Sequence, residues 1–533
     1  MENEARADVV VVGFGAAGAC AAIEAARAGA DVIVLDRFAG GGSTVLSGGV
    51  VYAGGGTDVQ REAGVADTPE AMYEYLRREV GDAVSADTLR RFCAGSAGMV
   101  RWLAELGVPF EASLCPYKTS YPSNRHYLYY SGSEAAGGFR DAAPPAPRGH
   151  RVRGRGTSGY VLFRALARAV RSCGVRVLTQ ARAVGLVTDD DGRVVGVDCL
   201  RLTGVPALAH RWLSRYAAKP GLYLPPVRRA LHARAEALER RYGRPLRVRA
   251  RRGVVLAAGG FIANREMVRS HAPAYRRGLA LGTAGDDGSG IALGVAAGAA
   301  TAELGAVSAW RFITPPSAFL GALLVDSGGR RVCDESRYGA ALGHALVTEC
   351  GGRGWLLVDA ELVRAARRQL RSQTVWFQWA QARYLLGPRR ASGATLDEVA
   401  ARAGVDAAGL RATVEAHNAA ARAGRPDPAG KPPEFVTPLE RPPYSLLDVS
   451  IRRSAWYPCP MLTLGGLAVA EDTGAVLRAD AAGGSIPGLY AAGRTAVGLC
   501  SRSYVSGLSL ADCVFAGRRA GRAAGVDTNE NVF

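Results

Sequence analysis

Two hydroxyl side chains stand two positions apart near the C-terminal end of the chain: Tyr504 and Ser506, in the stretch SYVSGLSL. The glycine, the leucines and the other serines of this stretch suit a loop that approaches a ligand closely and then enters a helix. A phenol and an alcohol can each donate a hydrogen bond to a carbonyl oxygen and take part in proton transfer. Which ligand they face depends on what the other end of the chain binds.

Residues 8–36 carry a dinucleotide-binding fingerprint. An apolar run leads into Gly13, Gly15 and Gly18, and a helix of small residues and a second apolar run ending at Asp36 follow. In such a βαβ unit the first glycine allows a tight turn, the second lets the backbone approach a diphosphate, and the third lets the helix pack on the strand. The helix N-terminus offers amide donors to the phosphates, and Asp36 is expected to accept hydrogen bonds from ribose hydroxyls.

A glycine-rich loop and two apolar runs favour FAD over NAD. Residues 40–49, GGGSTVLSGG, suit a loop that runs along an extended cofactor. Residues 252–261, RGVVLAAGGF, and 488–494, GLYAAGR, are apolar runs that end in small residues. Their order along the chain resembles the flavoprotein subunit family of fumarate reductase and succinate dehydrogenase, which includes the 3-ketosteroid dehydrogenases. The resemblance covers nearly the whole chain apart from residues 201–250.

This resemblance implies an α/β fold, in which a Rossmann-like FAD-binding domain is interrupted by an α+β capping domain that holds the substrate. We expect the first part of the FAD-binding domain at residues 1–263, the cap at 264–440 and the C-terminal part of the FAD-binding domain at 441–533. The proline- and glycine-rich segment 423–435 is expected to lead back from the cap.

The family also implies which residues contact the cofactor. FAD is expected to be non-covalent, because the histidine that carries a covalent flavin in some relatives has no counterpart in residues 40–49. No metal site is expected, since the ten cysteines are scattered singly. Besides the four fingerprint residues, the expected FAD contacts are Ala16, Ala17, Arg37, Gly42, Ser43, Thr44, Ser47, Gly48, Gly49, Ala183, Val184, Ala258, Gly259, Asp287, Gly493, Arg494, Ser509 and Leu510.

Departures from the fumarate reductases predict an apolar substrate. Those enzymes carry an arginine at the position of Tyr504 and two histidines at the positions of Met461 and Leu462. Arginine and histidine side chains there clamp the carboxylates of a small dianion. A site without these cations suits a mostly apolar molecule with one or two neutral oxygens.

The steroid branch of the family carries a tyrosine at the position of Tyr504 and a second tyrosine in a cap segment, here residues 334–338, DESRY. The resemblance therefore implies that Tyr504 polarises a 3-keto group, that Tyr338 is the base and that Ser506 relays the proton. A tyrosine has an ordinary pKa of about 10, so it needs such a relay near neutral pH. The Tyr504–Ser506 pair is most similar to the 3-oxo-5α-steroid 4-dehydrogenases, which form the bond between carbons 4 and 5 by proton abstraction and hydride transfer to flavin N5.

Other interpretations remain open from the sequence. The chain could be a 3-ketosteroid 1-dehydrogenase, a fumarate-reductase-like reductase of another unsaturated substrate, or a non-catalytic flavin-binding electron carrier. Tyr504 could simply pack beneath the flavin. The aromatic run at residues 374–386 suits a pocket wall or a core helix, and His150 and Arg151 are expected on a solvated surface.

The charge of the chain does not indicate a nucleic-acid partner. The net charge of +18 comes almost entirely from arginine, with lysine only at Lys118, Lys219 and Lys431, and it is spread along the chain. The acidic start and the absence of an apolar run of about 20 residues favour a cytoplasmic protein. An external electron acceptor, whose chemistry the sequence leaves open, is implied.

Residues 201–250 form an excursion rich in basic and aromatic residues. It suits either a solvated insertion packed on its own domain or a basic amphipathic hairpin in peripheral contact with an anionic membrane surface. The strands on either side are complete without it. We therefore expect the excursion to be dispensable for flavin binding and turnover.

Overall fold

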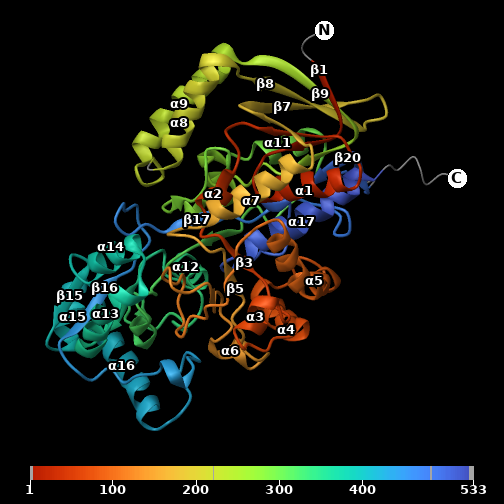
Figure 1. The fold of residues 1–533 in the computed structure, drawn as a ribbon. Coiled ribbons are helices and arrows are strands. Elements are labelled where there is room, and N and C mark those ends of the chain that lie inside the picture. The colour runs from red at the N-terminus through yellow and green to blue at the C-terminus, as the bar shows by residue number, and fades with distance from the viewer. Residues whose placement is uncertain (1–3, 220, 481–482, 527–533) are drawn as a thin grey trace.

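A sheet built from both ends of the chain organises the protein (Figure 1). The structure, a computed structural model, describes residues 4–219, 221–480 and 483–526. Within these residues the largest sheet has eight strands, with parallel strands in the order β20-β9-β1-β2-β6. β19 lies antiparallel at one edge, and the antiparallel pair β7-β8 joins the first half of β9. These strands are β1 (Glu4–Val12), β2 (Val32–Asp36), β6 (Arg176–Thr179), β7 (Ala181–Thr188), β8 (Val194–Arg201), β9 (Arg244–Leu256), β19 (Ala475–Leu477) and β20 (Ser485–Ala491).

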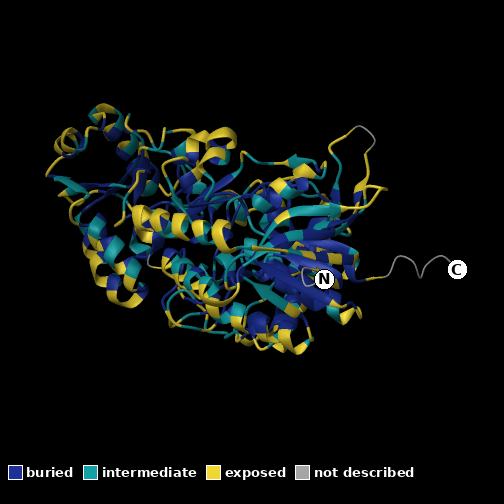
Figure 2. Cartoon of the chain, turned by 90° about the horizontal axis from the view of Figure 1, so that it is seen from above, coloured by how far each residue is buried: buried dark blue, intermediate teal, exposed yellow. Residues whose placement is uncertain are grey.

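The sheet is buried on both faces, as Figure 2 shows for its strands. Val10 and Val12 of β1 belong to one hydrophobic core, and Val9 and Val11 belong to the other. Because successive side chains of a strand point to opposite faces, a continuous valine run is what a two-sided parallel sheet requires. The predicted α/β class with a Rossmann-like sheet is confirmed.

The C-terminal helix packs directly on the fingerprint helix. α17 (Leu508–Gly525) lies along α1 (Ala16–Arg27), and Gly517 and Gly521 face the backbone of Ala17 and Ala21 so closely that a Cβ atom would clash. This contact holds the loop before α17, which contains Tyr504 and Ser506, beside the N-terminal glycine motif. α7 (Gly159–Ser172) also packs against α1.

A second, antiparallel sheet lies on the other side of α17, in the order β3-β5-β4. Its strand β3 is joined to the loop before α17, because the Tyr52 N–H donates to the carbonyl of Gly507 at 3.1 Å. The elements of this part are α2 (Gly42–Leu46), β3 (Val50–Tyr52), α3 (Asp58–Glu62), α4 (Pro69–Val80), α5 (Ala86–Glu105), β4 (Leu128–Tyr129), α6 (Gly137–Arg140) and β5 (Gly149–Arg151).

The cap is a four-stranded antiparallel sheet, in the order β13-β14-β16-β15, with helices around it. β16 pairs with both β14 and β15, so the sheet continues past residue 440, where we expected the cap to end. Residues 423–435 therefore connect two elements of the cap instead of leading out of it. The elements are β13 (Leu323–Val325), α12 (Gly339–Thr348), β14 (Trp355–Val358), α13 (Ala360–Gln373), α14 (Trp376–Leu385), β15 (Arg390–Gly393), α15 (Leu396–Ala403), α16 (Ala407–Arg422) and β16 (Tyr444–Asp448).

Short strands join the large sheet to the cap. They form the sheet β10-β17-β12 and the pair β11-β18. The elements are α10 (Arg265–His271), β10 (Leu279–Ala280), α11 (Ser289–Ala296), β11 (Thr301–Ala302), β12 (Val307–Ala309), β17 (Pro460–Thr463) and β18 (Gly466–Leu467).

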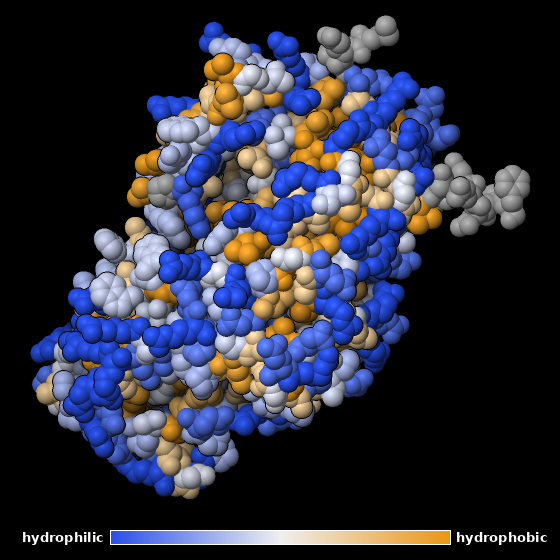
Figure 3. All heavy atoms as spheres, viewed as in Figure 1, coloured by the Kyte–Doolittle hydropathy of each residue, from blue (hydrophilic) through white to orange (hydrophobic). Residues whose placement is uncertain are grey.

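The excursion between β8 and β9 is a helical hairpin. α8 (Gly204–Ala218) and α9 (Pro225–Tyr242) pack side by side and project from one end of the large sheet (Figure 1). In Figure 3 the surface is hollowed beside this hairpin. Within the described parts of the chain, no helix combines the length and the apolar character needed to cross a membrane.

Candidate active site

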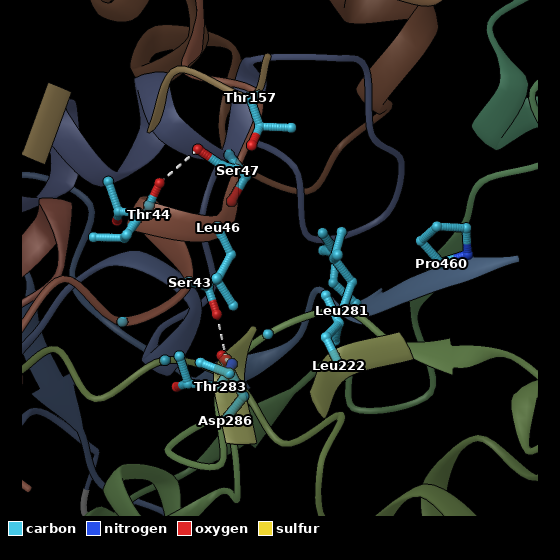
Figure 4. A pocket seen from close by; sticks show the side chains of 18 of the residues that line it. Ser43, Thr44, Leu46, Ser47, Thr157, Leu222, Leu281, Thr283, Asp286 and Pro460 are labelled. Carbon is cyan, nitrogen blue, oxygen red and sulfur yellow. Dashed lines mark hydrogen bonds between the residues drawn. The ribbon is translucent and has the colours of Figure 1, made fainter. Parts of the chain in front are cut away.

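A cavity of about 1090 Å³ extends from the carboxyl ends of β1 and β2 to the cap. Its walls come from the glycine motif, the loop after β2, the hairpin, the loop before α17, and the cap segments around residues 310–315 and 376–385. Figure 4 shows Ser43 and Thr44 of α2 and Leu222 of the hairpin bordering it. The position is the one expected for a ligand of an open α/β sheet, at the carboxyl ends of its parallel strands.

The glycine motif has the geometry that an extended diphosphate ligand needs. Gly13 adopts φ +104° against the backbone of Ala257 and Ala258, where a side chain has no room. A Cβ atom on Gly15 would point toward open space, with Thr44 Oγ1 nearest at 3.6 Å. Gly18 instead packs on the backbone of Gly13 and does not line the cavity. The residues present therefore fit a dinucleotide.

Asp36 holds the loop after β2 and borders the cavity. Its carboxylate accepts the backbone N–H groups of Phe14 at 2.9 Å, Phe38 at 2.8 Å and Gly40 at 3.1 Å. Burial raises the pKa of this carboxyl, and the three N–H donors oppose the rise. A carboxylate can accept about four hydrogen bonds, so capacity remains for one ribose hydroxyl.

Asp286 lies in the cavity wall, where Asp287 was expected. It accepts hydrogen bonds from Ser43 Oγ, from the Thr283 N–H at 3.0 Å and from Arg494, as Figure 4 shows for Ser43. Among the described residues, Nη1 of Arg494 is buried and has no protein acceptor. An unpaired guanidinium N–H is costly unless a ligand accepts from it. Arg494 therefore fits an acceptor group of a bound cofactor.

Asp287 faces away from the cavity. One carboxylate oxygen pairs with Arg37 at 2.8 Å, and the other accepts the Ser289 N–H at the start of α11 at 2.9 Å. Val184 is half exposed and Gly493 packs on Ala17, so neither lines the cavity. The expected cofactor residues that do line it are Gly13, Gly15, Ala16, Ala17, Asp36, Arg37, Gly42, Ser43, Thr44, Ser47, Gly48, Gly49, Ala183, Ala258, Gly259, Arg494, Ser509 and Leu510.

Tyr504, Ser506 and Tyr338 border the same cavity, and all three are buried. The rings of Tyr504 and Tyr338 are 6.2 Å apart. Tyr504 also stacks on Trp310, with ring centres 5.4 Å apart and planes inclined by 15°. The sequence-derived candidates from the C-terminal loop and from the cap thus come together.

Ser506 has a partner that the sequence analysis missed. The hydroxyl of Tyr129, in β4, lies 3.2 Å from Ser506 Oγ. The hydroxyl of Ser131 donates to the backbone carbonyl of Ser506 at 3.0 Å. No motif surrounds Tyr129, and only the pairing of β4 with β5 shows which way it faces.

The cap segment at residues 334–338 is fixed by buried polar contacts. Tyr338 is the N-cap residue of α12, and its N–H donates to Ser133 Oγ at 3.1 Å. Glu335 forms ion pairs with Arg331 and Lys431, both at 2.7 Å; Glu335 and Lys431 are buried and Arg331 is nearly so. Breaking such a pair leaves an uncompensated buried charge, so this network restrains the segment that carries Tyr338.

Burial keeps both phenols protonated near neutral pH. It raises the pKa of Tyr338 well above its ordinary value; the nearby Tyr504 and Tyr129 add to this, and a hydrogen-bond interaction with Ser506 opposes it. Burial also raises the pKa of Tyr504, opposed by a backbone interaction with Gly507. Tyr504 is therefore suited to donate a hydrogen bond, and Tyr338 is a protonated phenol, not a phenolate, in the resting protein.

His150 and Arg151 are fully buried, which corrects the expectation of a solvated surface. The guanidinium of Arg151 donates to backbone carbonyls, among them Ser123 at 2.9 Å and Gly156 at 2.8 Å, and lies over the ring of Tyr121. Burial lowers the pKa of His150 to about 4. These contacts give both residues a structural role outside the cavity.

The aromatic run at 374–386 serves both purposes left open by the sequence. Trp376, Phe377 and Gln381 line the cavity, whereas Ala382 and Leu385 are also part of the core. α14 therefore contributes both to the wall of the cavity and to the core of the cap.

Comparison with known proteins identifies the relatives of this chain. The family model described as FAD binding domain matches residues 8–507. The 3-oxo-5-alpha-steroid 4-dehydrogenase of Comamonas testosteroni is 41% identical over 500 residues, which cover 91% of this chain and 92% of that protein. The crystal structure of 3-ketosteroid-delta4-(5alpha)-dehydrogenase from Rhodococcus jostii RHA1 in complex with 4-androstene-3,17-dione is similar with a TM-score of 0.82 and 33% identity, covering 98% of this chain and 97% of that chain. A 3-oxosteroid 1-dehydrogenase of Mycobacterium tuberculosis is 29% identical over 564 residues, covering 93% and 94% of the two chains.

Proposed function

The chain belongs to the FAD binding domain family, and on this premise we propose that it uses FAD to form the double bond between carbons 4 and 5 of a 3-keto-5α-steroid. It is an FAD-dependent oxidoreductase, like the steroid dehydrogenases it matches. The observation that carries the proposal is the meeting of Tyr504, Ser506 and Tyr338 in one cavity beside the glycine motif.

The substrate end of the cavity supports an apolar ketone. Leu462, at a position where the fumarate reductases carry a histidine, lines the cavity, and Trp310 and Phe312 add aromatic surface. Arg311 is also in the wall, but its guanidinium lies 4.3 Å from the centre of the Tyr457 ring. No second arginine lies beside it to complete a dicarboxylate clamp in the described substrate end.

Each residue of the site has its own role in this reaction. Tyr504 donates a hydrogen bond to the 3-keto oxygen, and this bond strengthens as the oxygen gains enolate character. Ser506 takes the proton that leaves carbon 4 and gives its own hydroxyl proton to the Tyr338 oxygen, while Tyr338 releases its phenolic proton toward the solvent side of the cavity. Tyr129 orients the Ser506 hydroxyl. When bound, FAD supplies the acceptor for the hydride that leaves carbon 5. The substrate loses one proton and one hydride, and an external acceptor later takes the two electrons.

Anaerobic titration tests this function. A 3-keto-5α-steroid should bleach the flavin of the purified protein without any other reductant, and the product should carry the 4,5 double bond. A 1,2 double bond would instead identify a 1-dehydrogenase. A flavin that no ketosteroid reduces, but that reoxidises with fumarate, would exclude steroid dehydrogenation and favour the reductase alternative.

We also propose that the outer face of α8 makes peripheral contact with an anionic membrane, which would deliver a lipid-like substrate to a cytoplasmic enzyme. Val205, Leu208, Trp212 and Tyr216 are exposed by 77%, 62%, 57% and 43% and follow one helical stripe. Sedimentation with anionic and with neutral vesicles tests this contact. Absence of binding to both types of vesicle, or equal binding to both, would refute it.

A further inference from the structure

We propose that the α8–α9 hairpin is part of the cofactor site, and that Arg211, Arg215 and Lys219 bind the diphosphate of FAD. The inference rests on the proposed use of FAD and concerns how the chain holds it. It replaces the sequence-based expectation that residues 201–250 are dispensable for flavin binding.

The base of the hairpin is fastened to the loop after β2. Glu239 of α9 accepts from Arg37 Nε at 2.7 Å, from His210 Nε2 at 3.0 Å and from Arg182 at 3.2 Å. Burial alone would raise the pKa of Glu239, but His210 and Arg37 outweigh it and hold the pKa at about 2. The ring of His210 also lies parallel to Phe38, 5.6 Å away. The hairpin is therefore attached where Asp36 and Arg37 border the cavity.

The far part of the hairpin is fastened on two further sides of the cavity. Arg228 of α9 is buried and donates to the carbonyls of Ala280 at 3.0 Å and Gly282 at 2.7 Å, just before Asp286. Lys219 Nζ reaches Thr157 Oγ1, in the loop before α7, at 3.2 Å. These contacts make the hairpin a fixed wall that spans the cavity, rather than a free excursion.

The polarity of α8 is the reverse of that expected for a helix packed on a protein core. Arg211, Arg215 and Lys219 recur every four residues; they are exposed to solvent, and they line the open cavity together with Ser214 and Leu222. The large apolar side chains of α8 face outward instead. A helix without a polar ligand beneath it would turn its apolar stripe inward. The cations on the cavity side of α8 therefore indicate an anionic ligand.

Two of these cations keep donors free for that ligand. Among the described residues, the Arg215 guanidinium has no ion-pair or hydrogen-bond partner, and Arg211 reaches only Gln180 Oε1, at 3.4 Å. The anionic group of FAD is its diphosphate. Gly15 and the N-terminus of α1, which favour the same group, border the same cavity.

Binding of FAD and of ADP to the apoprotein tests the proposal without relying on turnover. ADP shares the ribose, adenine and diphosphate of FAD but lacks the flavin. The test variant combines Arg211→Gln, Arg215→Gln and Lys219→Gln. The control is Arg234→Gln, which removes an exposed arginine of α9 that does not line the cavity. Flavin fluorescence gives the FAD affinity, calorimetry gives the ADP affinity, and circular dichroism checks that each apoprotein is folded.

We expect the triple variant to bind both FAD and ADP at least about 10-fold more weakly than the parent, a difference of roughly 1.4 kcal/mol. The affinity for ADP should also fall less steeply with increasing salt concentration, because fewer cationic side chains contact the diphosphate. The Arg234→Gln control should bind both ligands like the parent.

Four results would overturn the proposal. The triple variant could keep the parent affinities, or the control could weaken binding as much as the triple variant does. Weaker FAD binding with unchanged ADP binding would place the cations on another part of the cofactor. A parent apoprotein that binds no FAD would overturn the proposed cofactor use, and the role of the hairpin with it.

Discussion

The hydroxyl of Tyr129 lies 3.2 Å from Ser506 Oγ, although the two residues are 377 positions apart in the chain. Tyr129 is fully buried, and burial raises the pKa of its phenol, so the hydroxyl keeps its proton. It can therefore donate to Ser506 Oγ and leave the serine proton free to point elsewhere. This arrangement makes Tyr129 a positioning residue for the proposed proton relay.

Tyr129→Phe should slow anaerobic flavin reduction by about 5-fold, since one orienting hydrogen bond contributes roughly 1 kcal/mol. The KM for the steroid should not change, because Tyr129 acts on Ser506 and not on the ketone. Tyr127→Phe is the matched control, since its hydroxyl contacts Gly154 instead. Equal rates for the Tyr129 variant and the parent would contradict this role.

Tyr504→Phe should slow flavin reduction at saturating steroid by about 100- to 1,000-fold, the usual effect of losing one oxyanion donor. The phenylalanine ring keeps the stacking on Trp310, so FAD binding should remain intact. Stopped-flow absorbance of the flavin measures the rate. A variant as fast as the parent would show that Tyr504 does not polarise the ketone.

Tyr338→Phe should reduce the same rate by about 100-fold or more, as loss of a general acid–base group does. Ser506→Ala should have a smaller effect, because water can take the place of the serine in the relay. Since burial holds the pKa of Tyr338 well above its ordinary value, the parent rate should show no titration of this group between about pH 6 and 9. An inflection in that range that disappears in Tyr338→Phe would show that the pKa of Tyr338 is lower than its burial implies, and an unchanged rate in Tyr338→Phe would contradict its assignment as the base.

Local motifs predicted the parts of the site in which one short stretch carries the chemistry. The glycine motif and the Tyr504–Ser506 pair depend on residues close in sequence, and the structure places both at one cavity. FAD and the Rossmann-like fold are confirmed by the family match. The roles of Tyr504, Ser506 and Tyr338 stay predictions.

The remaining features depend on long-range packing. Asp286 and Asp287 are adjacent in one turn, and only the fold decides which of them meets Arg494. Arg151 is buried because distant carbonyls surround its guanidinium, which its charge alone could not reveal. The sequence of α8 predicted an amphipathic helix, but only the fold shows that its basic residues line a cavity.

Gly15→Val should abolish FAD binding, because the new side chain would fill the space where the diphosphate approaches the backbone. The protein itself should still fold, since the nearest atom to a Cβ at this position is 3.6 Å away. Purified Gly15→Val should therefore be colourless and show the circular dichroism of the parent apoprotein. A yellow variant with the parent's FAD affinity would show that the diphosphate does not pass Gly15.

Asp512 should make the protein less stable as pH rises from about 4 to about 6. Burial in α17 raises the pKa of this carboxyl to about 6, and interactions with Leu499 and Arg519 only partly oppose the rise. Between its unfolded value of about 3.9 and its folded value, the folded state binds the extra proton, so raising the pH favours unfolding. The effect is on the order of 3 kcal/mol and is complete above pH 6. Asp512→Asn keeps the shape of the side chain and the acceptor for Leu499 but lacks the charge. The denaturation midpoint of the variant should therefore rise relative to that of the parent as the pH is raised from about 4 to about 6. Parallel midpoints at pH 4 and pH 7 would show that Asp512 does not titrate in this way.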